Sequence, residues 1–257
     1  MRYALFVFAS VAPLLALDCN QGRNHQKDRG SFCEIREQTI AATGRFNVDG
    51  GTNGGVSVKG WKRADVQLRV QVQTWAEDDS AARGMSSQIR IDSSAGQIRA
   101  QGPDQSGKTK SGWAVSFELM VPERTDLALK TMNGGISIAD IHGRIEFSAV
   151  NGGVNLSRLG GDVEGKTTNG GLTVELAGDR WDGTKLDAST SNGGINLKVP
   201  ERYSAHMETG TVNGSLNVDL PVTVKGDLGK KLSFDMGSGG ATVRVTTTNG
   251  GVHIRKS

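Results

Sequence analysis

Carboxylates are the side chains in this sequence whose spacing comes closest to a catalytic pattern. Enzymes that cleave polysaccharides use paired acids, and Glu146 and Glu164 are separated by 18 residues, one period of a repeat described below. At that spacing they stack on the same outer strand, but the register positions that follow do not surround them with basic residues. Solvated strand faces therefore explain the acids better, and we predict no catalytic residue. The acids considered are Asp140, Glu146, Asp162, Glu164, Asp179 and Asp182.

The sequence contains no recognisable set of metal or cofactor ligands. Zinc sites bring about three or four ligands together, and His25, His142, His206 and His253 share no spacing with one another or with the cysteines. Calcium β-rolls place an aspartate after paired glycines, whereas here Ile-Ser-Ile, Val-Asn-Leu and Leu-Thr-Val follow the glycines. No phosphate loop or dinucleotide fingerprint is present. We expect neither a metal nor a cofactor.

The tryptophans are candidates for stacking on sugars. Trp113 alternates with Val115 and Phe117, which predicts a core position. Trp181 lies in "AGDRWDGTKL", where the regular spacing of the repeat is interrupted. Trp181 is therefore the better candidate of the two for exposure and for a surface contact.

The first residues, "MRYALFVFASVAPLLALDC", resemble a secretory signal, with Arg2 followed by an apolar run from Tyr3 to Leu17. The run is shorter than the roughly 20 residues of a membrane-spanning helix, and Pro13 interrupts it. We predict a signal peptide over residues 1–16 and an exported protein, which is periplasmic, at the cell surface or extracellular. No transmembrane helix is expected in the mature chain.

The two cysteines, Cys19 and Cys33, follow this leader closely. In an exported protein such a pair favours a disulfide. Lipid attachment at Cys19 and two free thiols are the alternatives. Asp18 argues against lipidation, because that processing favours a small residue before the cysteine.

Composition excludes several classes of protein. The chain has 36 glycines, 5 prolines and 5% aromatic residues, but the glycines follow no three-residue period, which excludes collagen. The net charge of +3 (+2 once Arg2 is removed) is mild and scattered. We therefore expect no nucleic-acid partner.

The first half of the chain predicts longer elements. Alternation of apolar and polar residues predicts strands over Ala64–Trp75, Ile89–Ala100 and Trp113–Val121, and a short helix within "AEDDSAARGMSSQI". The polar segment 17–44, which carries both cysteines, is expected to be a linker. Residues 45–130 are expected to cap one end of the repeats that follow.

An Asn-Gly turn recurs through the second half of the chain, at intervals of 18, 18, 23, 21 and 36 residues, with an earlier copy at Asn53 and a degenerate copy near Gly237. Short alternating strands follow each turn, and further glycine turns divide several units into nine-residue halves. The predicted structural turns are Asn133, Gly134, Gly135, Asn151, Gly152, Gly153, Asn169, Gly170, Gly171, Asn192, Gly193, Gly194, Asn213, Gly214, Asn249, Gly250 and Gly251.

Two folds compete to explain these turns. Asn-Gly is a strong hairpin signal, but a constant period with equivalent apolar pairs favours a parallel solenoid whose turns stack about 4.8 Å apart. Asn and Gly tolerate positive φ, and stacked asparagines can form a hydrogen-bonded ladder. We predict an all-β protein, a parallel β-solenoid of about 18-residue coils over 131–254 with an N-terminal strand cap.

Residues 45–254 resemble the bacterial putative adhesin domain of the DUF4097 type. The resemblance rests on "VSFELMVPERTDLALKTMNGGISI", "HGRIEFSAVNGGVNL", "GDVEGKTTNGGLTV", "LKVPERYSAHMETGTVNGSLNV" and "GGATVRVTTTNGGVHI". It implies an exported β-solenoid and supplies no catalytic or ligand residues.

These observations favour an exported, non-enzymatic envelope or surface protein that binds a polymer or protein partner through its repetitive strand faces. Two alternatives stay open from the sequence. One is a polysaccharide-processing β-helix enzyme, and the other is a structural spacer of the envelope.

Overall fold

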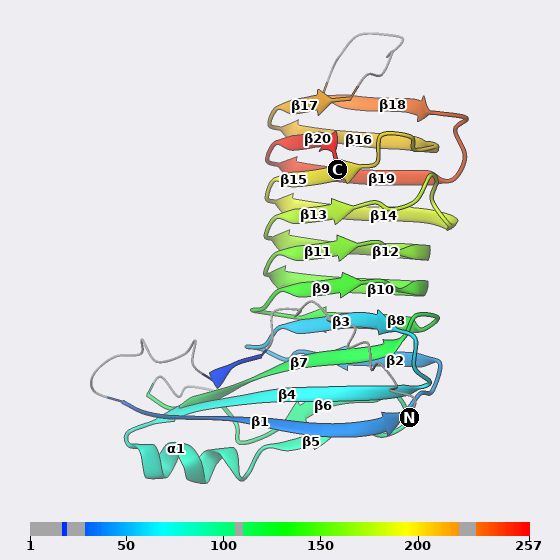
Figure 1. Cartoon of the computed structure of the whole chain (residues 1–257). Helices are drawn as coiled ribbons and strands as arrows, with labels where there is room; N and C mark the ends of the chain where they lie inside the picture. The colour runs from blue at the N-terminus through cyan, green and yellow to red at the C-terminus, as the bar shows by residue number, and fades with distance from the viewer. Residues whose placement is uncertain (1–16, 20–28, 106–109, 221–229) are drawn as a thin grey trace, which may run out of the picture.

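The computed structural model describes residues 17–19, 29–105, 110–220 and 230–257, and the expected signal peptide lies outside them. The described chain folds into two ten-stranded sheets that face each other, with a short helix at one end (Figure 1). Sheet A contains, in spatial order, β1 (Gly30–Ala41), β4 (Asp65–Ala76), β7 (Gly112–Pro122), β3 (Val56–Trp61), β9 (Ile136–Ala139), β11 (Val154–Ser157), β13 (Leu172–Glu175), β15 (Ile195–Val199), β20 (Val252–Lys256) and β17 (Leu216–Asp219).

Each coil of the chain contributes one strand to sheet A and one strand to sheet B. Sheet B contains, in spatial order, β18 (Lys231–Met236), β16 (Ala205–Asn213), β19 (Thr242–Asn249), β14 (Gly183–Asn192), β12 (Gly160–Asn169), β10 (His142–Asn151), β8 (Asp126–Thr131), β2 (Arg45–Asp49), β6 (Gln97–Gln101) and β5 (Arg90–Asp92). Alternate residues of both sheets point inward and form one hydrophobic core along the stack.

The repeating unit is a parallel coil, as the period of the sequence predicts. Ile145 of β10 pairs with Val163 of β12, and Val154 of β11 pairs with Leu172 of β13, each partner lying 18 residues further on. Equivalent residues therefore lie side by side in successive coils. A hairpin would pair them antiparallel, so the solenoid prediction is confirmed and the hairpin alternative is wrong.

The asparagines of the turns form a ladder of side-chain hydrogen bonds along the stack. From Asn133 onward, each Nδ2 donates to the Oδ1 of the asparagine in the neighbouring coil nearer the N-terminal end of the stack, at 2.7–3.2 Å. The spatial order of the ladder is Asn53, Asn133, Asn151, Asn169, Asn192, Asn249 and Asn213. The predicted asparagine ladder is therefore present.

The ladder also shows that the last coils are not stacked in sequence order. Strand β19 pairs with β14 on one side and β16 on the other, and β20 likewise lies between β15 and β17. The chain builds β16 and β17, turns back through the antiparallel strand β18, and then inserts its final coil one layer below (Figure 1). The glycines near Gly237 lie in the β18–β19 connection and are not a degenerate coil turn.

The stack begins earlier than the sequence predicted. Strands β2 and β3 pair in parallel with β8 and β9, and Asn53 joins the ladder, so the boundary at residue 131 is wrong. The expected linker over 17–44 is also wrong in part, because β1 pairs along its whole length with β4. The expected single strand over 89–100 is instead β5 and β6, which pair antiparallel around a turn where Ala95 and Gly96 have positive φ.

The remaining predicted elements are present. Helix α1 (Asp79–Ser86) is preceded by its N-cap residue, Asp78, whose side chain accepts a hydrogen bond from the Ala81 N–H. The helix packs below β1 and β4 (Figure 1). Strands β4 and β7 match the predicted ranges closely. No helix in the described ranges is both long and apolar enough to span a bilayer.

Candidate binding surface

A long hollow crosses the outer face of sheet B. One part, of about 900 Å³, runs over β6, β2, β8, β10, β12 and β14, and a second, of about 640 Å³, continues over β14, β19, β16 and β18. Ser189 of β14 lines both parts. We call the two together the sheet B groove. It crosses the strands and so follows the axis of the stack.

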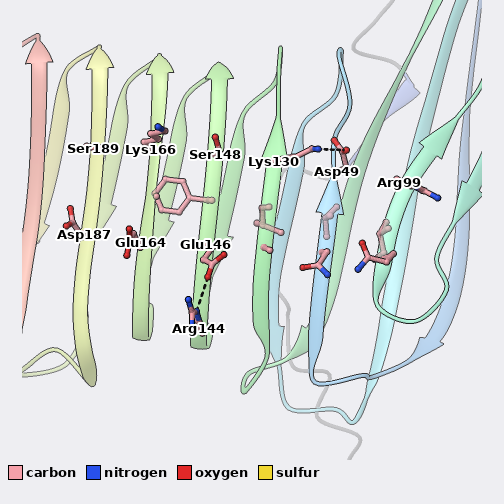
Figure 2. A pocket seen from close by; sticks show the side chains of 18 residues that line it. Asp49, Arg99, Lys130, Arg144, Glu146, Ser148, Glu164, Lys166, Asp187 and Ser189 are labelled. Carbon is pink, nitrogen blue, oxygen red and sulfur yellow. Dashed lines mark hydrogen bonds and ion pairs between the residues drawn. The ribbon is translucent and has the colours of Figure 1, made fainter. Parts of the chain in front are cut away.

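Because the coils stack in register, the outward side chains of the groove form rows along that axis. Figure 2 shows two of them across neighbouring strands. The acidic row consists of Glu146, Glu164 and Asp187, which pair in register on β10, β12 and β14. The lysine–hydroxyl row lies two residues further along each strand and consists of Lys130, Ser148, Lys166, Ser189 and Thr246.

A third row, two residues before the acidic row, alternates in charge. Its members in spatial order are Arg45, Asp126, Arg144, Asp162 and Lys185. Neighbours in this row are about one strand spacing apart, roughly 4.8 Å between backbones. Opposite charges that face each other at this distance are mildly stabilising, and like charges in the same places would be destabilising.

Cations next to the acidic row neutralise its carboxylates. Arg144 pairs with Glu146 at 2.9 Å, and Lys185 pairs with Glu164 at 2.7 Å. Arg244 bridges two strands, contacting Asp187 at 3.2 Å and Glu208 at 2.6 Å. The hydrogen bond from Lys185 lowers the pKa of Glu164, and the one from Arg244 lowers the pKa of Glu208. Both acids are therefore poor proton donors near neutral pH.

The stacking of Glu146 and Glu164 on one outer face agrees with the prediction. The expectation that basic residues do not surround them is wrong, because Arg144 and Lys185 supply a cation to each. Asp162 lies in the third row of the same face, whereas Asp140, Asp179 and Asp182 lie elsewhere. Asp140 pairs with Arg158 at 2.6 Å, and Asp182 contacts His142 at 3.3 Å, around a smaller hollow at the coil corners.

Trp181 is not a surface contact. Its side chain is only 5% exposed, belongs to the hydrophobic core, and donates from Nε1 to the Gly161 carbonyl at 3.1 Å. In the irregular loop that carries it, Trp181 alone turns into the core, while the neighbouring residues 177–180 and 182–184 are exposed. Trp113 is partly buried and packs against the core, which is close to the predicted position.

Cys19 and Cys33 are joined by a disulfide in the structure, with their Cα atoms 5.6 Å apart. Cys33 lies on β1, and the neighbouring Asp18 accepts a hydrogen bond at its carbonyl from Gln71 of β4 at 2.8 Å. Within the described ranges no group of three or more His, Cys, Asp or Glu side chains is arranged to hold a metal ion.

Sequence reasoning missed the lysine–hydroxyl row. Its signal was present, because Lys130, Ser148 and Lys166 follow one another at 18-residue intervals.

The fold and the groove define a class: a parallel β-solenoid, capped at its N-terminal end, with a continuous polar groove on one sheet. The profile of the Toastrack DUF4097 family matches residues 50–255, and the chain belongs to this family. No curated protein matches the chain significantly.

Several solved structures are similar to this chain at low identity. A putative cell adhesion protein from Clostridium sporogenes has a TM-score of 0.46 and 10% identity, covering 88% of this chain and 100% of its own. A putative adhesin from Parabacteroides merdae has a TM-score of 0.48 and 12% identity, covering 86% of this chain and 80% of its own. A putative lipid binding protein from Parabacteroides distasonis has a TM-score of 0.40 and 12% identity, covering 88% of this chain and 96% of its own.

Proposed function

We propose that this chain is an exported envelope or surface protein that binds a polymer or protein partner through the sheet B groove, without catalysis. The observation that carries the proposal is the groove itself, which crosses the strands from β6 to β18 and presents polar side chains in rows, one side chain of each row per coil. A partner that is itself extended or repetitive can contact many coils at once. Weak contacts then add up along the axis.

The electrostatics of the groove support binding over hydrolysis. A glycosidase needs one carboxylic acid whose pKa is raised, so that it can protonate the leaving group. In the acidic row the pKa of Glu164 is lowered, because Lys185 holds its carboxylate. Such a side chain fixes charge and geometry on the surface, and it does not suit the role of a general acid.

The test is a binding screen with the mature chain, residues 17–257, against a glycan array and against isolated cell-envelope polymers. We expect specific retention of at least one polymer or protein and no change in the retained molecule. Release of a cleavage product would overturn the proposal in favour of a polysaccharide-processing enzyme. Absence of any retention would overturn it in favour of a spacer.

A further inference from the structure

Some charged side chains that line the sheet B groove have an ion-pair partner and others do not. Its carboxylates are all in ion pairs: Asp49 with Lys130 at 3.0 Å, Glu146 with Arg144, Glu164 with Lys185, and Asp187 and Glu208 with Arg244. Lys166 and Lys231 also line it, but neither has a carboxylate partner among the residues that the structure describes. The unpaired charge of the groove is therefore positive.

Lys166 lies at the centre of the lysine–hydroxyl row, between two hydroxyls. Ser148 of β10 and Ser189 of β14 are its neighbours in register, and Thr246 and Lys130 extend the row on either side. Lys130 and Lys166 are two strands apart, roughly 10 Å between backbones. Figure 2 shows Ser148, Lys166 and Ser189 following one another on neighbouring strands. The row thus presents a cation, a hydroxyl and a second cation in a line along the groove.

We propose that the sheet B groove binds a linear anionic polysaccharide lengthwise, with Lys166 contacting a carboxylate or sulfate group and the flanking serines contacting sugar hydroxyls. The inference rests on the proposed function and names the class of polymer. An extended chain fits because the row follows the axis of the stack and spans five neighbouring strands, from β8 to β19, along the hollow. The ammonium group of lysine is a compact charge that accepts anions in several orientations, as a repeating polymer requires.

Nucleic acids fit the groove less well. Proteins that bind single strands stack the bases on exposed aromatic side chains. Among the described residues that line the larger part of the groove, Phe147 is the one aromatic, and it is only 4% exposed. A polysaccharide needs no such stacking platform, because its hydroxyl groups can hydrogen-bond to the serines that flank Lys166.

The test measures binding of polygalacturonate, dextran sulfate, neutral dextran and a single-stranded oligonucleotide to the mature chain and to Lys166→Gln. We expect salt-sensitive binding of one or both anionic polysaccharides and a twofold to fivefold weaker Kd in the variant, roughly the contribution of one exposed ion pair. Lys166 is exposed and unpaired, so the variant should fold normally, which a urea melt checks. Lys59→Gln is the matched control, because it removes the same charge from the outer face of sheet A.

Several outcomes would overturn the inference. They are equal binding of neutral dextran, tighter binding of the oligonucleotide, and identical affinities for the Lys166 and Lys59 variants. In each case the proposed function stands if the broader screen still retains a partner. If that screen retains nothing, both proposals fail together.

Discussion

The two glycines of each turn have different neighbours in the stack. A Cβ on the first glycine, as at Gly152, would clash with the carbonyl oxygen of Gly134 in the adjacent coil. A Cβ on the second, Gly153, would lie 3.5 Å from the Gly171 oxygen, an ordinary contact. The expected positive φ is wrong for Gly152 and Gly170, since only Gly250 among the predicted turn glycines has one. The first glycine is needed because neighbouring backbones approach closely.

This difference predicts unequal effects of the same substitution at adjacent positions. Gly152→Ala should lower the free energy of unfolding by about 1–3 kcal/mol, because the methyl group forces two coils apart. Gly153→Ala should change it by less than about 0.5 kcal/mol, and Ser215 already stands at the equivalent position of another turn. Urea melts of both variants measure the difference, and equal stabilities would contradict it.

Threonine side chains inside the turns donate hydrogen bonds to the carbonyl groups of these first glycines. The Thr167 hydroxyl donates to the Gly152 oxygen at 2.8 Å, and Thr190 and Thr247 repeat the contact in other coils. Thr167→Val keeps the shape but removes the donor, so we expect a loss of about 1 kcal/mol. Thr168→Val, on the exposed face next to it, is the control and should be near neutral. A thermal or urea melt in which both variants match the parent would show that these hydroxyls contribute nothing.

At the scale of whole strands, the order of the last coils has consequences for local stability. Strand β19 is hydrogen-bonded on both sides although it lies near the C-terminus, whereas β20 is the one neighbour of β17 among the described strands. Opening β19 would disrupt two strand interfaces, and opening β17 would disrupt one. We therefore predict slower amide hydrogen exchange in β19 than in β17. Exchange followed by mass spectrometry measures this, and fast exchange throughout β19 would contradict the inserted coil.

Local patterns in the sequence predicted the strands and turns but not their spatial order. The 18-residue period fixes which residues are neighbours in consecutive coils, and it correctly placed Asn133, Asn151 and Asn169 in one ladder. It does not say that Asn249 lies between Asn192 and Asn213, because all turns carry nearly the same residues. That order is imposed by β18, which reverses direction and returns the chain to the lower layer.

The candidate surface was predictable only in part, for a related reason. Alternation shows which residues of β10 or β12 point outward, so the stacking of Glu146 and Glu164 followed from spacing. Which cations reach them depends on side-chain contacts between strands, such as Lys185 with Glu164. The burial of Trp181 depends on how an irregular loop folds over the core, and no periodic pattern describes that loop.

At the scale of the whole molecule, α1, β1 and β4 close the N-terminal end of the stack and are joined by hydrogen bonds. The α1 helix is held on β1 and β4: Arg36 donates to the Ser86 and Ile89 carbonyls at 2.8 and 2.7 Å, and Thr74 donates to the Ala82 carbonyl at 2.8 Å. This packing buries Ala82 and places a helix over the end of the stack, the kind of cover that blunts the exposed end of a sheet. The Cys19–Cys33 bond then anchors the segment before β1 to this cap.

The last prediction concerns the first residue and the disulfide of the protein as it is recovered from the envelope or the medium. Intact-mass analysis should show a chain that starts near Leu17 and is lighter than its reduced form by a pair of hydrogen atoms. Because the bond joins cysteines 14 residues apart, its loss in Cys33→Ser should cost about 3 kcal/mol in the chain-entropy model. Urea melts of the oxidised, reduced and Cys33→Ser proteins measure that cost. A retained Met1 or a diacylglycerol adduct at Cys19 would contradict the predicted export and pairing.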